Sequence, residues 1–197
     1  YPEEVQKIEG RDFVKKTDKT KVIVGPAESM SKSKKNTIDP EKMIENYGAD
    51  SVRWFILSDS PPEKDVQWSD IGVISANKFL QRIYNLIFSV TKRPERKGNK
   101  KIEDEFISDI NNFVVKIDSS INNFRFNVAI AQFYEVYTFF KNCLDKELRN
   151  KTLHENITKI IKIMVPFTPH LAYECLEMLK CNSVNIWPKI DKNNLSE

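Results

Sequence analysis

Three serines and three lysines alternate near the N-terminal end of the sequence. The segment Ser29–Lys35 reads Ser-Met-Ser-Lys-Ser-Lys-Lys. Small hydroxyl residues let a backbone come close to a ligand, and lysine ammonium groups with exposed N–H groups suit phosphate oxygens. These residue types therefore indicate a loop that binds phosphate.

A solvated loop is the simpler alternative, because a Ser/Lys run between two structural elements is usually no more than that. The sequence also lacks the Gly-x-x-x-x-Gly-Lys-Ser/Thr pattern of a P-loop. From the residues alone, both interpretations of the segment stay open.

The neighbouring residues predict how the loop is held. The β-branched run Lys21–Val24 ends at Gly25-Pro26, which is typical of a strand followed by a turn. After the loop, Asp39 can cap a helix that has Pro40 at its first position, and Gly48 can end that helix in a left-handed conformation. The loop is thus expected to join a strand to a helix.

Most of the remaining chain has helical periodicity. Two prolines in Ser60–Asp65 predict a turn, and Lys92–Lys101, with Pro94, Gly98 and six basic residues, predicts a flexible linker. The expected helices cover residues 40–47, 51–57, 69–91, 102–121, 127–145, 151–165 and 171–179. We therefore predict a mainly α fold, in which a small α/β region carrying the loop precedes an antiparallel helical bundle.

Composition limits the possible functions. The 197 residues are 40% hydrophobic and 30% charged with a net charge of +3, which is typical of a soluble globular protein and permits nucleic-acid binding without requiring it. No apolar run is long enough to span a membrane. Three cysteines (Cys143, Cys175 and Cys181) without C-x-x-C spacing favour free thiols, and with two distant histidines no metal site is expected.

Several segments, in order, resemble the bacterial leucyl-tRNA synthetases, which are class I aminoacyl-tRNA synthetases. The loop is similar to their Lys-Met-Ser-Lys-Ser signature, with Ser in the first place. The most discriminating match is Ser60–Asp70, which reads Ser-Pro-Pro-Glu-Lys-Asp-Val-Gln-Trp-Ser-Asp. The other matching segments are Tyr47–Arg53, Phe79–Tyr84, Pro166–His170 and Trp187-Pro188.

The resemblance implies a C-terminal part of such an enzyme. Residues 1–68 would form the end of the catalytic region and the stem-contact region, and residues 69–197 a helical domain of the anticodon-binding type. The sequence begins at Tyr1 and has no His-x-Gly-His motif of the Rossmann half. We therefore expect a fragment that is inactive by itself and binds no cofactor tightly.

The implied activity is leucine–tRNA ligation in a cytoplasmic, monomeric enzyme. Its substrates would be ATP with Mg²⁺, leucine and tRNA(Leu). Lys32 would be the catalytic residue that stabilises charge on the transferred phosphate, within an ATP-binding set of Ser29, Met30, Ser31, Lys32 and Ser33.

Candidate tRNA contacts lie in the helical part of the chain. They are Arg82, Lys92, Arg93, Arg96 and Lys97. For each of them, an exposed charge or a linker position is an equally good explanation. Aromatic residues are dense between Phe124 and Phe140, where core packing is favoured over stacking on bases.

Two departures from the family pattern leave alternatives open. Ser29 replaces a lysine, and Gly72–Ala76 has no carboxylate where leucyl enzymes commonly have Gly-Val-Glu-Gly-Ala. The chain could instead be a piece of a valyl-, isoleucyl- or methionyl-tRNA synthetase. It could also be a helical RNA-binding module without catalytic activity.

Overall fold

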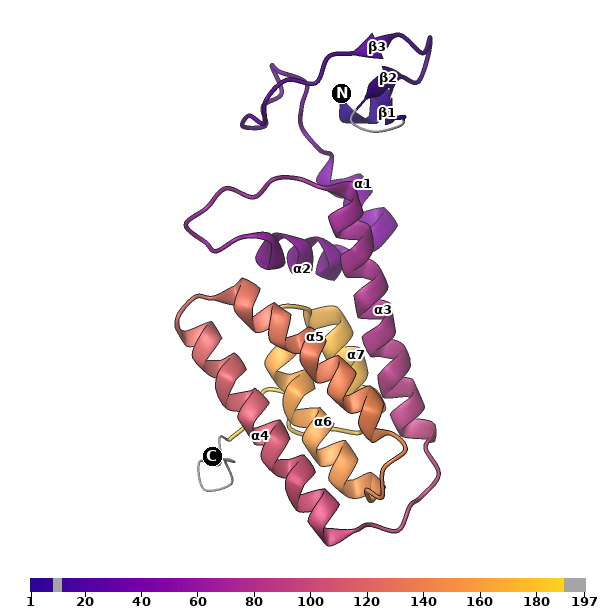
Figure 1. The fold of residues 1–197 in the computed structure, drawn as a ribbon, viewed down its shortest axis with the longest axis vertical. Helices are drawn as coiled ribbons and strands as arrows, with labels where there is room; N and C mark the ends of the chain where they lie inside the picture. Colours follow the sequence, from indigo (N-terminus) through magenta and orange to yellow (C-terminus); the bar gives the residue numbers. More distant parts are fainter. Residues whose placement is uncertain (9–11, 190–197) are drawn as a thin grey trace. The chain divides into compact units, whose positions relative to one another are not determined.

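The computed structural model describes residues 1–8 and 12–189, and the chain divides into two compact units, residues 1–46 and 47–197 (Figure 1). The predicted functional boundary after residue 68 does not coincide with this division. Residues 49–59 pack against helices of the second unit, although the resemblance placed them with the catalytic region. The functional boundary therefore stays a prediction.

The first unit contains a small antiparallel sheet. After a short 3₁₀ turn, η1 (Pro2–Glu4), the strands β1 (Val5–Lys7), β2 (Phe13–Lys15) and β3 (Lys21–Val22) follow in sheet order β1-β2-β3. The third strand is shorter than predicted, since Ile23 and Val24 continue past it with exposed fractions of 93% and 61%. Among the described residues of this unit, Val14 is the buried apolar side chain.

Helices dominate the remainder, and the mainly α fold is confirmed. Helix α1 (Pro40–Tyr47) joins the units, and the second unit contains α2 (Ala49–Asp59), α3 (Asp70–Lys92), α4 (Lys100–Asn122), α5 (Phe126–Cys143), α6 (Asn150–Met164) and α7 (Pro169–Met178) (Figure 1). Helix α3 packs mainly on α2 and α7, whereas α4 packs on α5 and α6.

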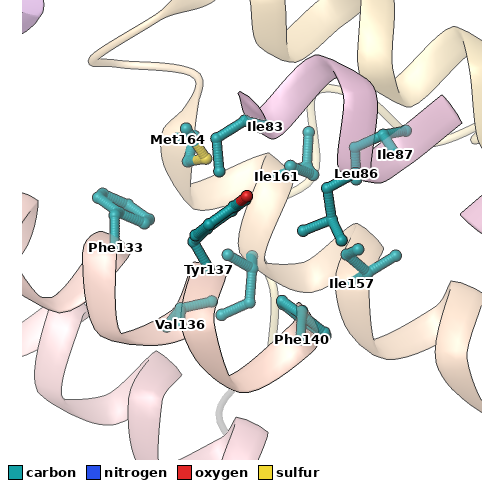
Figure 2. A pocket seen from close by; sticks show the side chains of 11 residues that line it. Ile83, Leu86, Ile87, Phe133, Val136, Tyr137, Phe140, Ile157, Ile161 and Met164 are labelled. Carbon is teal, nitrogen blue, oxygen red and sulfur yellow. The ribbon is translucent and has the colours of Figure 1, made fainter. Parts of the chain in front are cut away.

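The core of the second unit is built around Trp54, whose side chain is fully buried. Its ring centroid lies 5.4 Å from that of Phe79 on α3, 5.8 Å from Phe133 on α5 and 6.3 Å from Phe167 before α7. Where α3, α5 and α6 meet, the apolar side chains leave a void of about 10 Å³ (Figure 2). A void of this size with an apolar lining offers no room for a ligand.

The ends of several helices coincide with residues that are suited to capping. Ser69 caps α3, as predicted, by accepting a hydrogen bond of 3.1 Å from the backbone N–H of Gly72. Gly48 has the positive φ that was predicted, +78°, but its ψ of 151° lies outside the left-handed helical region. Asn99 was not recognised as the cap of α4, although its side chain accepts from the N–H groups of Lys101 and Ile102.

The segment after α3 is not the flexible linker that its composition predicted. The Arg93 guanidinium donates hydrogen bonds of 2.9 Å each to the carbonyl groups of Leu144, Lys146 and Leu148 in the α5–α6 connection. Asn150 returns a 2.9 Å bond to the carbonyl of Arg93. These hydrogen bonds hold the predicted linker against the α5–α6 connection, which lies more than 50 residues further along the chain. No local sequence pattern reveals such contacts.

An ion pair between the buried carboxylate of Glu103 and the exposed side chain of Arg149 joins α4 to the start of α6. Both carboxylate oxygens of Glu103 accept from the Arg149 guanidinium at 2.6–3.0 Å, and one also accepts from the Thr152 hydroxyl at 2.8 Å. Chiefly because of the Arg149 hydrogen bonds, the pKa of Glu103 is lowered to about 2. Deprotonated Glu103 thus holds the two helices together.

We expect Glu103→Gln to lower the free energy of unfolding at pH 7 by about 2 kcal/mol, since the amide leaves part of this buried network unsatisfied. Because the folded-state pKa lies below the ordinary 4.5, the carboxylate contributes fully above pH 4.5 and its contribution is lost as the pH falls toward 2. Urea unfolding at pH 7 and pH 3 measures both effects. Glu105→Gln, at an exposed position of the same helix, is the control, and an equal pH response in both variants would contradict the prediction.

Candidate functional site

The Ser/Lys loop is ordered by a side chain that the sequence analysis did not single out. The Asn36 amide oxygen accepts a 2.8 Å hydrogen bond from the Ser31 backbone N–H, and its nitrogen donates at 3.3 Å to the carbonyl of Ser29. The Ser31 hydroxyl also lies 3.2 Å from that of Ser33. Asn36 therefore bridges the two ends of the loop through these two hydrogen bonds, which we call the clasp. Its position in a polar run could have suggested this role.

The lysines of the loop differ in their surroundings. Residues 32–35 form a turn in which the N–H of Lys35 donates to the carbonyl of Lys32 at 3.2 Å, and Lys35 has φ +53°. The ammonium group of Lys34 forms an ion pair with Glu28. Among the residues that the structure describes, Lys32 has no side-chain partner, so its ammonium group remains available to an anion.

The end of the loop is anchored to α1 as predicted. The Asp39 carboxylate accepts a 3.0 Å hydrogen bond from the N–H of Glu41, and Pro40 begins the helix. The remaining predicted members of the ATP-binding set, Ser29 and Met30, are exposed. The structure thus brings all five residues into one short, solvent-facing loop, whose ligand stays a prediction.

The five predicted tRNA contacts separate into two groups. Arg93 is occupied by the backbone carbonyls named above, and burial lowers the pKa of its guanidinium. Arg96 donates to the carbonyl oxygen and the carboxylate of Asp145 at 2.6 and 3.0 Å. In contrast, Arg82, Lys92 and Lys97 are exposed and have neither a hydrogen bond nor an ion pair to any residue in the described ranges.

Two segments of the family resemblance meet in the helical unit, where Asp50 contacts His170, 120 residues further along the chain. The Asp50 carboxylate, 7% exposed, accepts from the backbone N–H of Leu171 at 2.8 Å, from His170 Nδ1 at 3.1 Å and from Arg53 at 2.8 Å. Thr168, which precedes α7, makes no capping hydrogen bond through its own side chain. The Asp50 carboxylate therefore satisfies the first turn of α7, while Gly48 precedes α2, the helix to which Asp50 belongs.

Residues 1–8 and 12–189 contain neither a metal-binding cluster nor a membrane-spanning helix. No cluster of three His, Cys, Asp or Glu side chains arranged to hold a metal ion occurs in these ranges. Within the same ranges, no helix is long and apolar enough to cross a membrane. All three cysteines are free thiols, as predicted, and burial raises the pKa of Cys175 to about 12.

Comparison with known proteins gives two family matches on successive parts of the chain. Residues 22–69 match the family described as tRNA synthetases class I (I, L, M and V). Residues 103–197 match the anticodon-binding domain of tRNA ligase. The first match contains the Ser/Lys loop, and the second begins within α4.

The similar curated proteins are leucine–tRNA ligases. The ligase of Hyphomonas neptunium is 38% identical over 195 residues, which is 96% of this chain and 23% of that protein. The ligase of Acidiphilium cryptum is 38% identical over 180 residues, 88% of this chain and 21% of that protein. This chain therefore spans less than a quarter of the length of these relatives.

A solved structure shares the fold. It is a ternary complex of an Agrobacterium radiobacter LeuRS with tRNA and LeuAMS. The match covers 85% of this chain and 23% of the LeuRS chain, with a TM-score of 0.75 and 24% sequence identity. At this identity the likeness shows the arrangement of the helices and no more.

Asn36→Ala tests the clasp at the base of the loop. Loss of the acceptor for the Ser31 N–H removes a hydrogen bond that contributes about 1 kcal/mol, so hydrogen exchange at that amide should become about fivefold faster. Amide exchange followed by NMR measures this. Thr37→Ala, which leaves the clasp intact, should change the rate little, and equal rates in the two variants would show that the clasp does not order the loop.

Asp50→Ala should lower the free energy of unfolding by about 2 kcal/mol, because it leaves the first turn of α7 without its acceptor. Asp50→Asn keeps an oxygen toward Leu171 and should lose less. Urea unfolding at pH 7 measures both variants, and an Asp50→Ala protein as stable as the unchanged chain would refute the role given to this carboxylate.

Proposed function

We propose that this chain, which belongs to the class I aminoacyl-tRNA synthetases, is part of a leucine–tRNA ligase that activates leucine with ATP and charges tRNA(Leu). The similarity to leucine–tRNA ligases over almost the whole chain supports this substrate assignment. So does the Ser60–Asp70 segment, which distinguishes the leucyl enzymes from the valyl, isoleucyl and methionyl ones. ATP, bound with Mg²⁺, is a substrate in this proposal.

The very small hydrophobic core of the first unit supports the proposal that this chain is part of a longer protein. With Val14 as the buried apolar side chain among its described residues, the unit buries too little apolar surface to be stable by itself. Its exposed Ile23 and Val24 are suited to being covered by the rest of a catalytic region. A cytoplasmic, monomeric enzyme several times the length of this chain is part of the same proposal.

The observation that carries the proposed chemistry is the ammonium group of Lys32 at the exposed turn, which has no partner among the described residues. In the first reaction the leucine carboxylate attacks the α-phosphorus of ATP, leucyl-adenylate forms and pyrophosphate leaves. Lys32 stabilises the negative charge that develops on the phosphoryl oxygens. Ser31 and Ser33 shape the turn and offer hydroxyl and N–H groups, while Asn36 holds its base.

The helical unit is proposed to bind tRNA, which accepts the leucyl group at its terminal ribose in the second reaction. The anticodon-binding family match supports this role. Phosphate contacts would position the RNA without reading its sequence. A helical RNA-binding module that catalyses nothing is the competing function, because the anticodon-binding family match by itself requires no catalysis.

Lys32→Ala in the full-length protein should lower the rate of leucine-dependent ATP–pyrophosphate exchange by more than about tenfold, since one preorganised positive charge is lost. Leucine affinity should change little. Lys34→Ala is the matched control, because Lys34 is paired with Glu28, and it should change the rate by less than about threefold.

Exchange assays with all twenty amino acids distinguish the alternatives. Exchange with valine, isoleucine or methionine in place of leucine would contradict the substrate, and unchanged exchange in Lys32→Ala would contradict the role of this lysine. Absence of exchange in the full-length protein would favour the non-catalytic module. Residues 1–197 alone are expected to show no exchange.

A further inference from the structure

The surface of α3 that faces away from the core carries positive charge without compensating carboxylates. Lys78, Arg82 and Lys92 lie on one side of this helix, at positions i, i+4 and i+14. Asp70 is the acidic residue of α3, and its carboxylate accepts from the Trp68 indole at the very start of the helix. The remaining 22 residues of α3 contain no Asp or Glu.

Neutral hydrogen-bonding side chains fill the same stripe. Ser75, Asn85 and Ser89 are exposed between the cations, and together these residues make up what we call the α3 stripe: Ser75, Lys78, Arg82, Asn85, Ser89 and Lys92. From Lys78 to Lys92 the stripe extends about 21 Å at 1.5 Å per residue. That length is sufficient to follow several successive phosphates of one nucleic-acid strand.

Packing leaves the stripe open. Helix α3 turns Phe79, Ile83, Ile87 and Val90 into the core. It packs on α2, α6 and α7. Neither Lys78 nor Arg82 has a hydrogen bond or ion pair within the described part of the chain. Lys92 lies 5.6 Å from the ring centroid of Phe88, an aromatic side chain that is 49% exposed beside the stripe.

The lysines of the other long helices are surrounded differently. Helix α4 has three lysines and five acidic residues, and its Lys101 lies 4.0 Å from Glu105. On α6, Lys151 lies 3.9 Å from Glu155, and Lys162 donates to Ser183 at 2.8 Å. Lys101, Lys151 and Lys162 thus each have a side-chain partner, whereas the cations of α3 have no hydrogen bond or ion pair among the described residues.

We infer that the α3 stripe is the surface through which the helical unit holds the phosphate backbone of tRNA. This inference rests on the proposed RNA-binding function and assigns it to one helix face. Exposed cations on a rigid helix attract phosphates without an ordering cost to the backbone, and Phe88 offers an aromatic edge to an adjacent ribose or base. Arg93 and Arg96, bound to the α5–α6 connection, serve to position the C-terminal end of α3.

The test compares two triple variants of the 197-residue chain with the same loss of three charges. One carries Lys78→Gln, Arg82→Gln and Lys92→Gln, and the control carries Lys101→Gln, Lys116→Gln and Lys151→Gln on exposed positions of α4 and α6. Glutamine is a good helix former, so both should keep the circular dichroism of the unchanged chain. Fluorescence anisotropy with a labelled tRNA(Leu) transcript gives the dissociation constant between 50 and 200 mM KCl.

The α3 variant should bind at least about tenfold more weakly at 50 mM KCl, and its slope of log K against log [KCl] should decrease in magnitude by about 3, one for each lost phosphate contact. The control should bind within about threefold of the unchanged chain. An equal loss of tRNA affinity in both variants, or no loss in the α3 variant, would overturn the assignment to α3. Neither result would contradict RNA binding by the helical unit. Absence of salt-dependent tRNA binding by the unchanged chain would overturn both.

Discussion

The burial of one indole ring determines how the helices of the second unit lie against one another. Trp54 on α2 contacts Phe79 on α3, Phe133 on α5 and Phe167 before α7, so that three segments distant in sequence pack on a single side chain. Because Phe79, Ile83 and Val90 of α3 turn into this core, the side of α3 that carries Lys78, Arg82 and Lys92 faces the solvent. The hydrophobic core thereby decides which charges the molecule presents to a polyanion.

Charged side chains, either buried or half-buried, complete the fold at the ends of helices, where backbone groups lack partners. Asp50 receives the first turn of α7, Glu103 receives the residue before α6, and Arg93 satisfies carbonyl groups of the connection between α5 and α6. Each is costly to remove from water and is tolerated because several hydrogen bonds satisfy it. Such groups define where one element meets another more sharply than apolar contact does.

The sequence predicted the helices well because periodicity and capping are local properties, as Ser69 and Gly48 illustrate. It also predicted the Ser/Lys loop as one connected segment. It could not show that Arg93 reaches across to residues 144–148, because pairing over 50 residues leaves no local pattern. For the same reason it could not show that Asp50 of α2 accepts from the first turn of α7, and it predicted a flexible linker after α3.

The scant interior of the first unit has a thermodynamic consequence. Heat capacity and enthalpy changes on unfolding scale with the surface that folding buries, and residues 1–46 bury very little apolar surface. A calorimetric scan of this chain would therefore record the melting of the helical unit almost alone, and a single transition would say nothing about the Ser/Lys loop. The loop can accordingly rearrange around a ligand at small energetic expense, while the helices retain the rigidity of a packed core.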